Sequence, residues 1–123
     1  MRLNLEAETL SQLFAQAAEE TTRRLCGVDL PGAALREKIV VEASDLSALL
    51  QNWIDTLLHL FQDQRMAFSR FEFHELRCAD HRWRLRADVT GDWVPAVAAW
   101  RCHGAQVIQA PPGFQARFEL RSS

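Results

Sequence analysis

The sequence has few of the cysteines that build a redox or zinc site. Its three cysteines, Cys26, Cys78 and Cys102, are far apart and form no CxxC pair. Zinc ribbons and thioredoxin-like motifs need such pairs, so both are excluded. We expect reduced, mostly buried thiols, as is usual in a cytoplasmic protein.

Glycine is also sparse, and the catalytic motifs that depend on it are missing. The five glycines are scattered and form no phosphate-binding loop, and no serine lies in a GxSxG-like elbow. The four histidines, His59, His74, His81 and His103, have neither HxH nor HExxH spacing. His74 and His81 flank an expected hairpin turn and could face each other, although exposed turn histidines are commoner than a two-histidine metal site. These residues therefore indicate no autonomous active site.

Long hydrophobic runs and an excess of one charge are absent as well. No run approaches the roughly 18 apolar residues of a membrane helix. The start, MRLNLEAETL, carries Glu6 and Glu8 and lacks the apolar core of a signal peptide. The formal net charge is −2, which gives no general electrostatic attraction to nucleic acid. We expect a soluble, cytoplasmic protein that does not bind membranes.

What the chain does have is a globular balance of residues. Of its 123 residues, 48% are hydrophobic and 24% charged, and Lys38 is the only lysine beside many arginines. We attribute this arginine bias first to coding and second to forked hydrogen bonding. We expect residues 1–123 to form a single domain that buries roughly 65% of its unfolded surface.

Two segments have the three-and-four apolar spacing of amphipathic helices. The first begins after Thr9, which forms a capping-box pattern with Gln12, and Gly27 suits its C-terminal end. The second follows Ser44 as N-cap, with Asp45 in its first turn, and continues for four turns. Its wide apolar stripe predicts tight packing against a sheet.

Six segments are predicted as β-strands: five alternate apolar and polar residues, and KIVVEA (38–43) is a brief β-branched run. They are residues 3–7, 38–43, 71–74, 83–89, 100–103 and 114–120. The last four have one apolar and one polar face, as in an antiparallel sheet covered on one side, with turns at CADH and APPG. The order predicts an α+β fold in which two helices pack on one face of a mixed, mostly antiparallel sheet.

Arginines follow the polar face of these later strands. They are Arg70, Arg84, Arg86, Arg101, Arg117 and Arg121. One interpretation is cross-strand ion pairing with Glu72, Asp88 and Glu119 on a solvated face, which is the commoner case. The other is a surface that binds an acidic partner or an RNA backbone through arginine–phosphate hydrogen bonds.

The segment DLSALLQNWIDTLLHLFQDQRMAFSRFEF (residues 45–73) resembles the central segment of the archease family. There an acidic-Leu pair opens a helix rich in Leu and Trp, and a strand containing Phe follows a polar hinge. LEAETLSQLFAQAAEE (5–20) looks like the family's first helix, AAWRCHGAQV (98–107) is similar to its His-Gly segment, and FQARFEL (114–120) to its closing strand. The resemblance covers most of the chain in the right order.

Archeases are small accessory proteins, and the resemblance implies that this chain is one too. Archeases assist the GTP-dependent RNA-splicing ligase by promoting its guanylylation and turnover, and they carry a metal site built from acidic residues. The resemblance implies the ligase as protein partner, RNA served only indirectly, and a Ca, Mg or Mn ion if the site is intact. The alternative is a binding or scaffold module of archease fold that has lost the metal site and the cofactor activity. A small metal-dependent hydrolase would need ligands that the sequence does not contain.

The resemblance also assigns candidate site residues. Glu119 stands at the position of a family aspartate and is the candidate metal ligand. His103 and Gly104 match the family's His-Gly pair. With Arg101 and Arg117, His103 is expected to contact the ligase or a nucleotide phosphate.

Two family features have no counterpart in the sequence. Ala98 stands where the family has a lysine, and the family's His-Thr-Ala-Asp strand aligns immediately before Met1. Either the true start lies upstream of Met1 or the protein lacks this aspartate. With one carboxylate, a hard divalent cation would lack most of its oxygen ligands.

Overall fold

The order of helices and strands follows the predicted one. The computed structural model describes residues 1–26, 32–95 and 99–122, so Gly27 and Ala98 lie outside the described residues. The elements are β1 (Arg2–Ala7), α1 (Leu10–Cys26), β2 (Leu35–Ala43), α2 (Leu46–Gln64), β3 (Met66–Ala79), β4 (Arg82–Trp93), β5 (Trp100–Ala110) and β6 (Gly113–Ser122). Most of the strands are longer than their alternation indicated.

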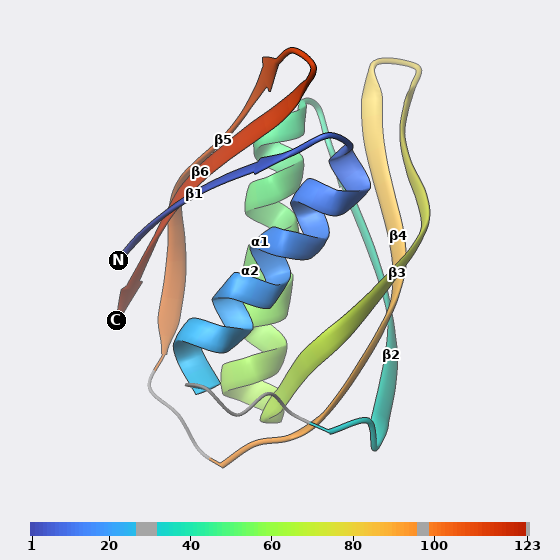
Figure 1. The fold of residues 1–123 in the computed structure, drawn as a ribbon. Coiled ribbons are helices and arrows are strands. Elements are labelled where there is room, and N and C mark those ends of the chain that lie inside the picture. The colour runs from blue at the N-terminus through green and yellow to red at the C-terminus, as the bar shows by residue number, and fades with distance from the viewer. Residues whose placement is uncertain (27–31, 96–98, 123) are drawn as a thin grey trace.

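The six strands form two antiparallel sheets of three strands each. The order in one is β1-β6-β5, which we call the terminal sheet, and the order in the other is β2-β4-β3, which we call the middle sheet. The two helices lie between the sheets (Figure 1). Helix α1 contacts β1, β6 and β3, and α2 contacts β5 as well as all strands of the middle sheet.

The α+β class is confirmed, and the arrangement of the sheet differs from the expected one. In place of one mixed sheet with both helices on one face, each helix contacts two separate sheets, and all the strand pairs described are antiparallel. The reason is that alternation gives each strand one apolar face but does not choose its hydrogen-bonding partner. Here the first strand pairs with the last, in the register Arg2–Glu119 to Ala7–Phe114.

The caps of both helices follow short local signals. The Gln12 amide donates to Thr9 Oγ1 at 3.2 Å, as the capping pattern predicts. The N-cap of α2 is Asp45, whose side chain accepts a hydrogen bond from the Ala48 amide at 2.8 Å. Ser44 as N-cap was therefore wrong by one residue, because both types cap well and only the geometry of the turn separates them.

Trp53 of α2 is the largest fully buried side chain of the core. Its indole Nε1–H donates to the Phe14 carbonyl of α1 at 3.0 Å. The rings of Phe71 and Phe73, from β3, lie 6.0 and 5.5 Å from the indole ring. This contact joins both helices to the middle sheet.

The predicted hairpin turns are present. β3 and β4 meet at Asp80 and His81, which have φ values of 52° and 61°. β5 and β6 meet at the predicted APPG turn. No helix in the described part of the chain is long and apolar enough to cross a membrane.

Candidate functional site

The pairing of the terminal strands brings the two principal site candidates together. Glu119 of β6 is in register with Arg2 of β1 on one side and with His103 of β5 on the other. Paired positions on neighbouring strands place their side chains on the same face. That face points away from the helices, because the intervening Phe118 and Leu120 are buried.

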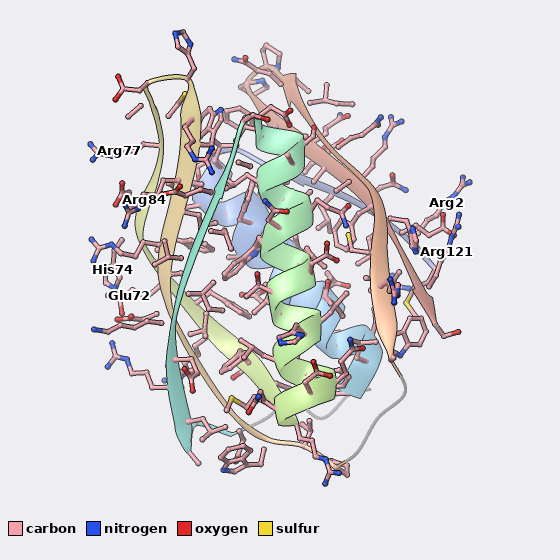
Figure 2. All side chains as sticks on the ribbon, turned by 180° about the vertical axis from the view of Figure 1, so that it is seen from behind. Arg2, Glu72, His74, Arg77, Arg84 and Arg121 are labelled. Carbon is pink, nitrogen blue, oxygen red and sulfur yellow. The ribbon has the colours of Figure 1, made fainter. Side chains whose placement is uncertain are left out.

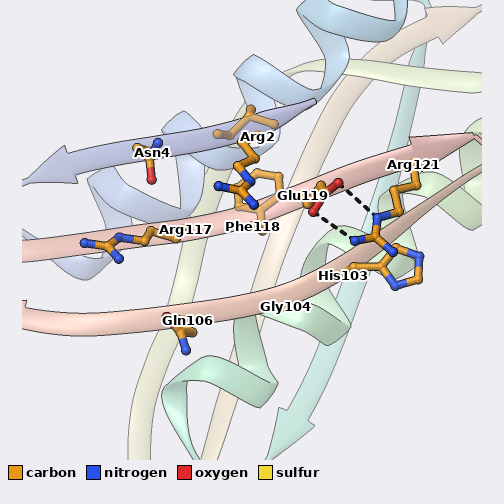
Figure 3. Close-up of a pocket in the computed structure, with 10 residues that line it drawn as sticks. Arg2, Asn4, His103, Gly104, Gln106, Arg117, Phe118, Glu119 and Arg121 are labelled. Carbon is orange, nitrogen blue, oxygen red and sulfur yellow. Dashed lines mark hydrogen bonds and ion pairs between the residues drawn. The ribbon is translucent and has the colours of Figure 1, made fainter.

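These residues line an open depression of about 480 Å³ on the outer face of the terminal sheet (Figure 3). Its charged lining residues are Arg2, Arg117, Arg121 and Glu119, and its other polar ones are Asn4, His103 and Gln106. Arg101 is exposed and in register with Arg121, but it does not line the depression. The structure thus gathers Glu119, His103 and Arg117, and leaves Arg101 beside them.

Gly104 is responsible for the shape of the β5 side of this depression. The β5–β6 register shifts between His103 and Gln106, and Gly104 has φ +63° at this bulge. A residue with a Cβ is strained at this φ, although nothing in the described structure lies within 4 Å of where the Cβ would be. Because of the extra residue, His103 and Gln106 both line the depression.

Glu119 is already bound by a cation from its own strand. Arg121 Nε donates to Oε1 at 3.0 Å and Nη2 to Oε2 at 3.2 Å (dashed in Figure 3). Hydrogen bonding from Arg121 lowers the pKa of Glu119, and the positive charges of Arg121, the N-terminal amine and Arg2 lower it further. The carboxylate is therefore held ionised and neutralised without a metal.

The residues that line this depression do not fit the divalent ion that the family resemblance implies. Ca²⁺ and Mg²⁺ take about six or more oxygen ligands, and carboxylates supply the charge. Among the described lining residues Glu119 is the one carboxylate, and Asn4 and Gln106 could add amide oxygens. Both Glu119 oxygens face Arg121, and two more arginines border the same space.

A second polar cluster lies on the outer face of the middle sheet. Glu72, His74 and Asp88 each offer one possible metal-ligating atom, all within 4.8 Å of one another. His74 Nε2 lies 3.0 Å from Asp88 Oδ2, so the expectation that His74 could face His81 was wrong: His81 is a turn residue, and β3 places His74 beside β4 farther along. Arg36 Nη2 also lies 3.0 Å from Asp88 Oδ2 and 3.9 Å from Glu72 Oε2, so one cation offsets part of the charge of the two carboxylates.

The outer faces of the two sheets differ in how their arginines are paired. On the middle sheet, ion pairing is extensive: the paired arginines are Arg36, Arg77, Arg82, Arg84 and Arg86. Cross-strand ion pairing, the commoner of the two predicted interpretations, therefore holds there for Arg84 and Arg86, while Arg70 has no carboxylate within 4.0 Å among the described residues. On the terminal sheet only Arg121 has a carboxylate partner, and within the described ranges none lies within 4.0 Å of Arg2, Arg101 or Arg117. Figure 2 shows the two faces on opposite sides of the molecule.

Sequence reasoning gave no role to Arg2 and included Arg121 only as one of six arginines on a polar face. Arg2 carried no signal, because only the pairing of the first strand with the last places it beside Glu119. Arg121 was placed on the polar face, two residues from Glu119, and this spacing could have indicated the ion pair.

The fold and the depression define a small α+β protein with an open polar depression on its terminal sheet. Comparison with known proteins identifies the group to which it belongs. Residues 1–117 match the model of the "Archease protein family (MTH1598/TM1083)", and the chain belongs to the archease family.

Individual relatives are distant. The chain is 24% identical over 85 residues to protein archease of Methanosarcina mazei, and 24% identical over 84 residues to protein archease of Methanosarcina acetivorans. These matches cover 69% and 68% of this chain but 58% of each relative, less than two thirds of its length. The solution structure of Methanobacterium thermoautotrophicum protein 1598 superposes with a TM-score of 0.66 at 16% identity. That match covers 99% of this chain and 89% of the other, and it shows the shared fold.

Proposed function

We propose that this chain is an archease-like accessory protein that assists a GTP-dependent RNA-splicing ligase in tRNA splicing or RNA repair. It would act by promoting guanylylation and turnover of the ligase. Family membership supports this role. The observation that carries it is the register of Glu119 and His103, because the resemblance assigns these two residues to family positions far apart in the sequence and they lie opposite each other on β6 and β5.

The chain would bind and position its partner, the ligase, and would not catalyse a reaction itself. The described side chains that line the depression include no serine, threonine, cysteine or lysine that could serve as a nucleophile. They offer guanidinium, imidazole and amide groups, which are suited to recognition. The ligase is the proposed partner, in contact with His103, Arg101 and Arg117, and RNA would be served through the ligase.

We also propose that residues 1–123 act as one archease-like domain in the cytoplasm. The pairing of β1 with β6 supports a single unit, because it joins the two ends of the chain in one sheet. Reduced cysteines suit that compartment, and the described residues contain three free ones.

A second candidate function is a binding or scaffold module that has lost the metal-dependent activity. The specific observation in its favour is Arg121, which neutralises the carboxylate that a metal would need. In this case the chain would still bind its partner through the terminal sheet, without accelerating guanylylation.

A guanylylation assay of the cognate ligase separates the two functions. The ligase is incubated with GTP and Mn²⁺ or Mg²⁺, with and without this protein, and covalent guanylate on the ligase is followed in time. We expect acceleration, reduced by His103→Ala and by Arg117→Gln but not by Arg70→Gln on the middle sheet. Ligase binding without acceleration, together with no metal uptake by calorimetry, would leave only the scaffold function. Neither binding nor acceleration would reject both.

A further inference from the structure

We infer that the depression on the terminal sheet binds a phosphate group, and that Arg121 provides at Glu119 the positive charge that a metal ion would otherwise provide. The inference goes beyond the proposed function, because it concerns binding by this chain alone and needs no ligase. Four features of the described residues support it.

The first feature is the local charge. Three arginines and one carboxylate line the depression, so it carries two excess positive charges. The whole chain has a formal net charge of −2. The local excess is therefore not the average property of a basic protein, and it marks this part of the surface for an anion.

The second feature is the availability of the guanidinium groups. Arg2 and Arg117 are exposed and, among the described residues, have no carboxylate within 4.0 Å. Glu119 is in register with Arg2 on β1 and lies two residues from Arg117 on β6. Because Arg121 binds both oxygens of Glu119, this carboxylate repels an incoming anion less than a free one would. Guanidinium forks match phosphate oxygens in geometry and charge.

The third feature is the contrast with the other sheet. On the middle sheet, Arg82, Arg84 and Arg86 each lie within 4.0 Å of Glu42 or Glu75 on a neighbouring strand. Exposed arginines on a strand surface usually find such partners at little cost. The terminal sheet leaves Arg2, Arg101 and Arg117 without them, and a ligand that carries negative charge would take that place.

The fourth feature is the shape of the site. The volume of about 480 Å³ lies in the usual range for ligand sites, yet the depression is an open one on a sheet surface. Such a surface suits a phosphate group that projects from a larger molecule. The phosphate could belong to a nucleotide or to an RNA strand, and the recognising chemistry is the same in both.

The test uses inorganic pyrophosphate as the probe and the full chain in EDTA, so that no metal can bridge the two. Calorimetry at low ionic strength is expected to show binding by the native chain. Arg117→Gln and Arg2→Gln are each expected to weaken it about tenfold, the usual size of one lost charge-assisted contact. Arg70→Gln is the matched control: this arginine is also exposed and, in the described structure, has no carboxylate partner, but it lies on β3 of the middle sheet.

Further arms distinguish the source of the phosphate. ATP and GTP are compared with single-stranded RNA 10-mers bearing either a 5′-phosphate or a 5′-hydroxyl. Preference for the 5′-phosphorylated RNA identifies strand ends, equal binding of both RNAs identifies the backbone, and preference for the triphosphates identifies nucleotides. Each of these supports the inference if it depends on Arg117 and not on Arg70.

Three results would overturn the inference. Pyrophosphate and all the phosphate-bearing probes could fail to bind at low ionic strength. Arg70→Gln could weaken binding as much as Arg117→Gln, which would show a general charge effect. Binding could require Mn²⁺ or Mg²⁺ and vanish in EDTA, which would show that a metal and not Arg121 completes the site. The guanylylation assay is independent of all three, so failure of the inference leaves the proposed function standing.

Discussion

Arg121 and Glu119, two residues apart on β6, form a two-point ion pair at 3.0 and 3.2 Å on the outer face of the terminal sheet. Alternation along a strand places such residues on one face, so the pair needs no help from a neighbouring strand. A carboxylate that belongs to the family's acidic site by resemblance therefore has an arginine as its counter-ion. The electrostatics of the whole depression depend on this pair.

We predict that Arg121→Gln raises the pKa of Glu119, because hydrogen bonding from Arg121 is the largest cause of its lowered value. Carbon-13 NMR titration of the Glu119 carboxyl in both proteins would measure the shift. Arg117→Gln is the matched control on the same strand, and it should leave the pKa of Glu119 nearly unchanged. An unshifted titration in Arg121→Gln would contradict the assignment.

The same pair predicts a pH dependence of stability. A lowered pKa in the folded state means that Glu119 contributes stability above its unfolded pKa, and this contribution is lost as the pH falls through the folded pKa. Arg121→Gln should therefore reduce the free energy of unfolding at neutral pH more than at acidic pH. Urea unfolding at both pH values would measure the difference, and equal losses at the two would contradict the prediction.

Gly91 of β4 predicts a large loss of stability on substitution. A Cβ at this position would lie 1.9 Å from the Ala67 carbonyl oxygen and 2.6 Å from Phe68 Cα, which are backbone atoms of the paired strand. Gly91→Ala must therefore push β3 and β4 apart, at an expected cost of about 3 kcal/mol in the free energy of unfolding. Urea denaturation would measure it.

Gly104 provides the control, because its positive φ, and not a close approach of another strand, favours glycine there. Its φ of +63° strains a residue with a Cβ, but nothing described lies within 4 Å of the added atom. Gly104→Ala should cost about 1 kcal/mol. If Gly104→Ala proved the more destabilising of the two, the close approach at Gly91 would not be the controlling feature.

Substitution of Trp53 tests how much the contact between the helices contributes to the free energy of unfolding. Trp53→Phe removes the hydrogen bond to the Phe14 carbonyl and leaves space beside Phe71 and Phe73. The expected loss is about 2–3 kcal/mol in the free energy of unfolding, from the lost hydrogen bond and the cavity together. A loss below about 0.5 kcal/mol, as at an ordinary surface position, would show that the core repacks around the smaller ring.

Local patterns in the sequence predicted the elements well and their partners poorly. The apolar spacing of α2 located that helix, and alternation located the later strands, because burial of one face imposes a period on the residues. Alternation does not specify which strand pairs with which, so the division into two sheets was not predicted. The placement of Arg2 against Glu119 depends on that pairing of chain ends and was also missed.

The candidate site residues were proposed from the resemblance, and their role stays a prediction, whereas the side-chain partners around them could not be predicted from the sequence. Glu119 and His103 were matched to family positions, and they do lie in register. The same-face neighbours of Glu119, Arg117 and Arg121, have the opposite charge, whereas those of Arg84 are arginines, and neither pattern specifies a partner on another strand. Only the structure shows Arg84 within 4.0 Å of Glu42 and Glu75 across strands, and Glu119 bound by Arg121 of its own strand.

The reactivity of Cys102 on β5 tests how firmly the terminal sheet is packed against α2. Burial raises the pKa of the Cys102 thiol to about 12, and the charge of Asp55 adds to the shift. Cys78, on β3, is exposed. Because the thiolate is the reactive form, Ellman's reagent at about pH 8 should modify Cys78 quickly and Cys102 only after unfolding.

Mass spectrometry of digested samples at intervals would assign each modification, and a sample in denaturant would show that every thiol can react. Cys26 is half-buried and burial raises its pKa, so it should follow Cys78. Modification of Cys102 as fast as that of Cys78 would mean that β5 opens from α2 in the native state. The depression, one of whose sides is β5, would then be a transient feature, and the ligase contact placed on His103 would have to form only on binding.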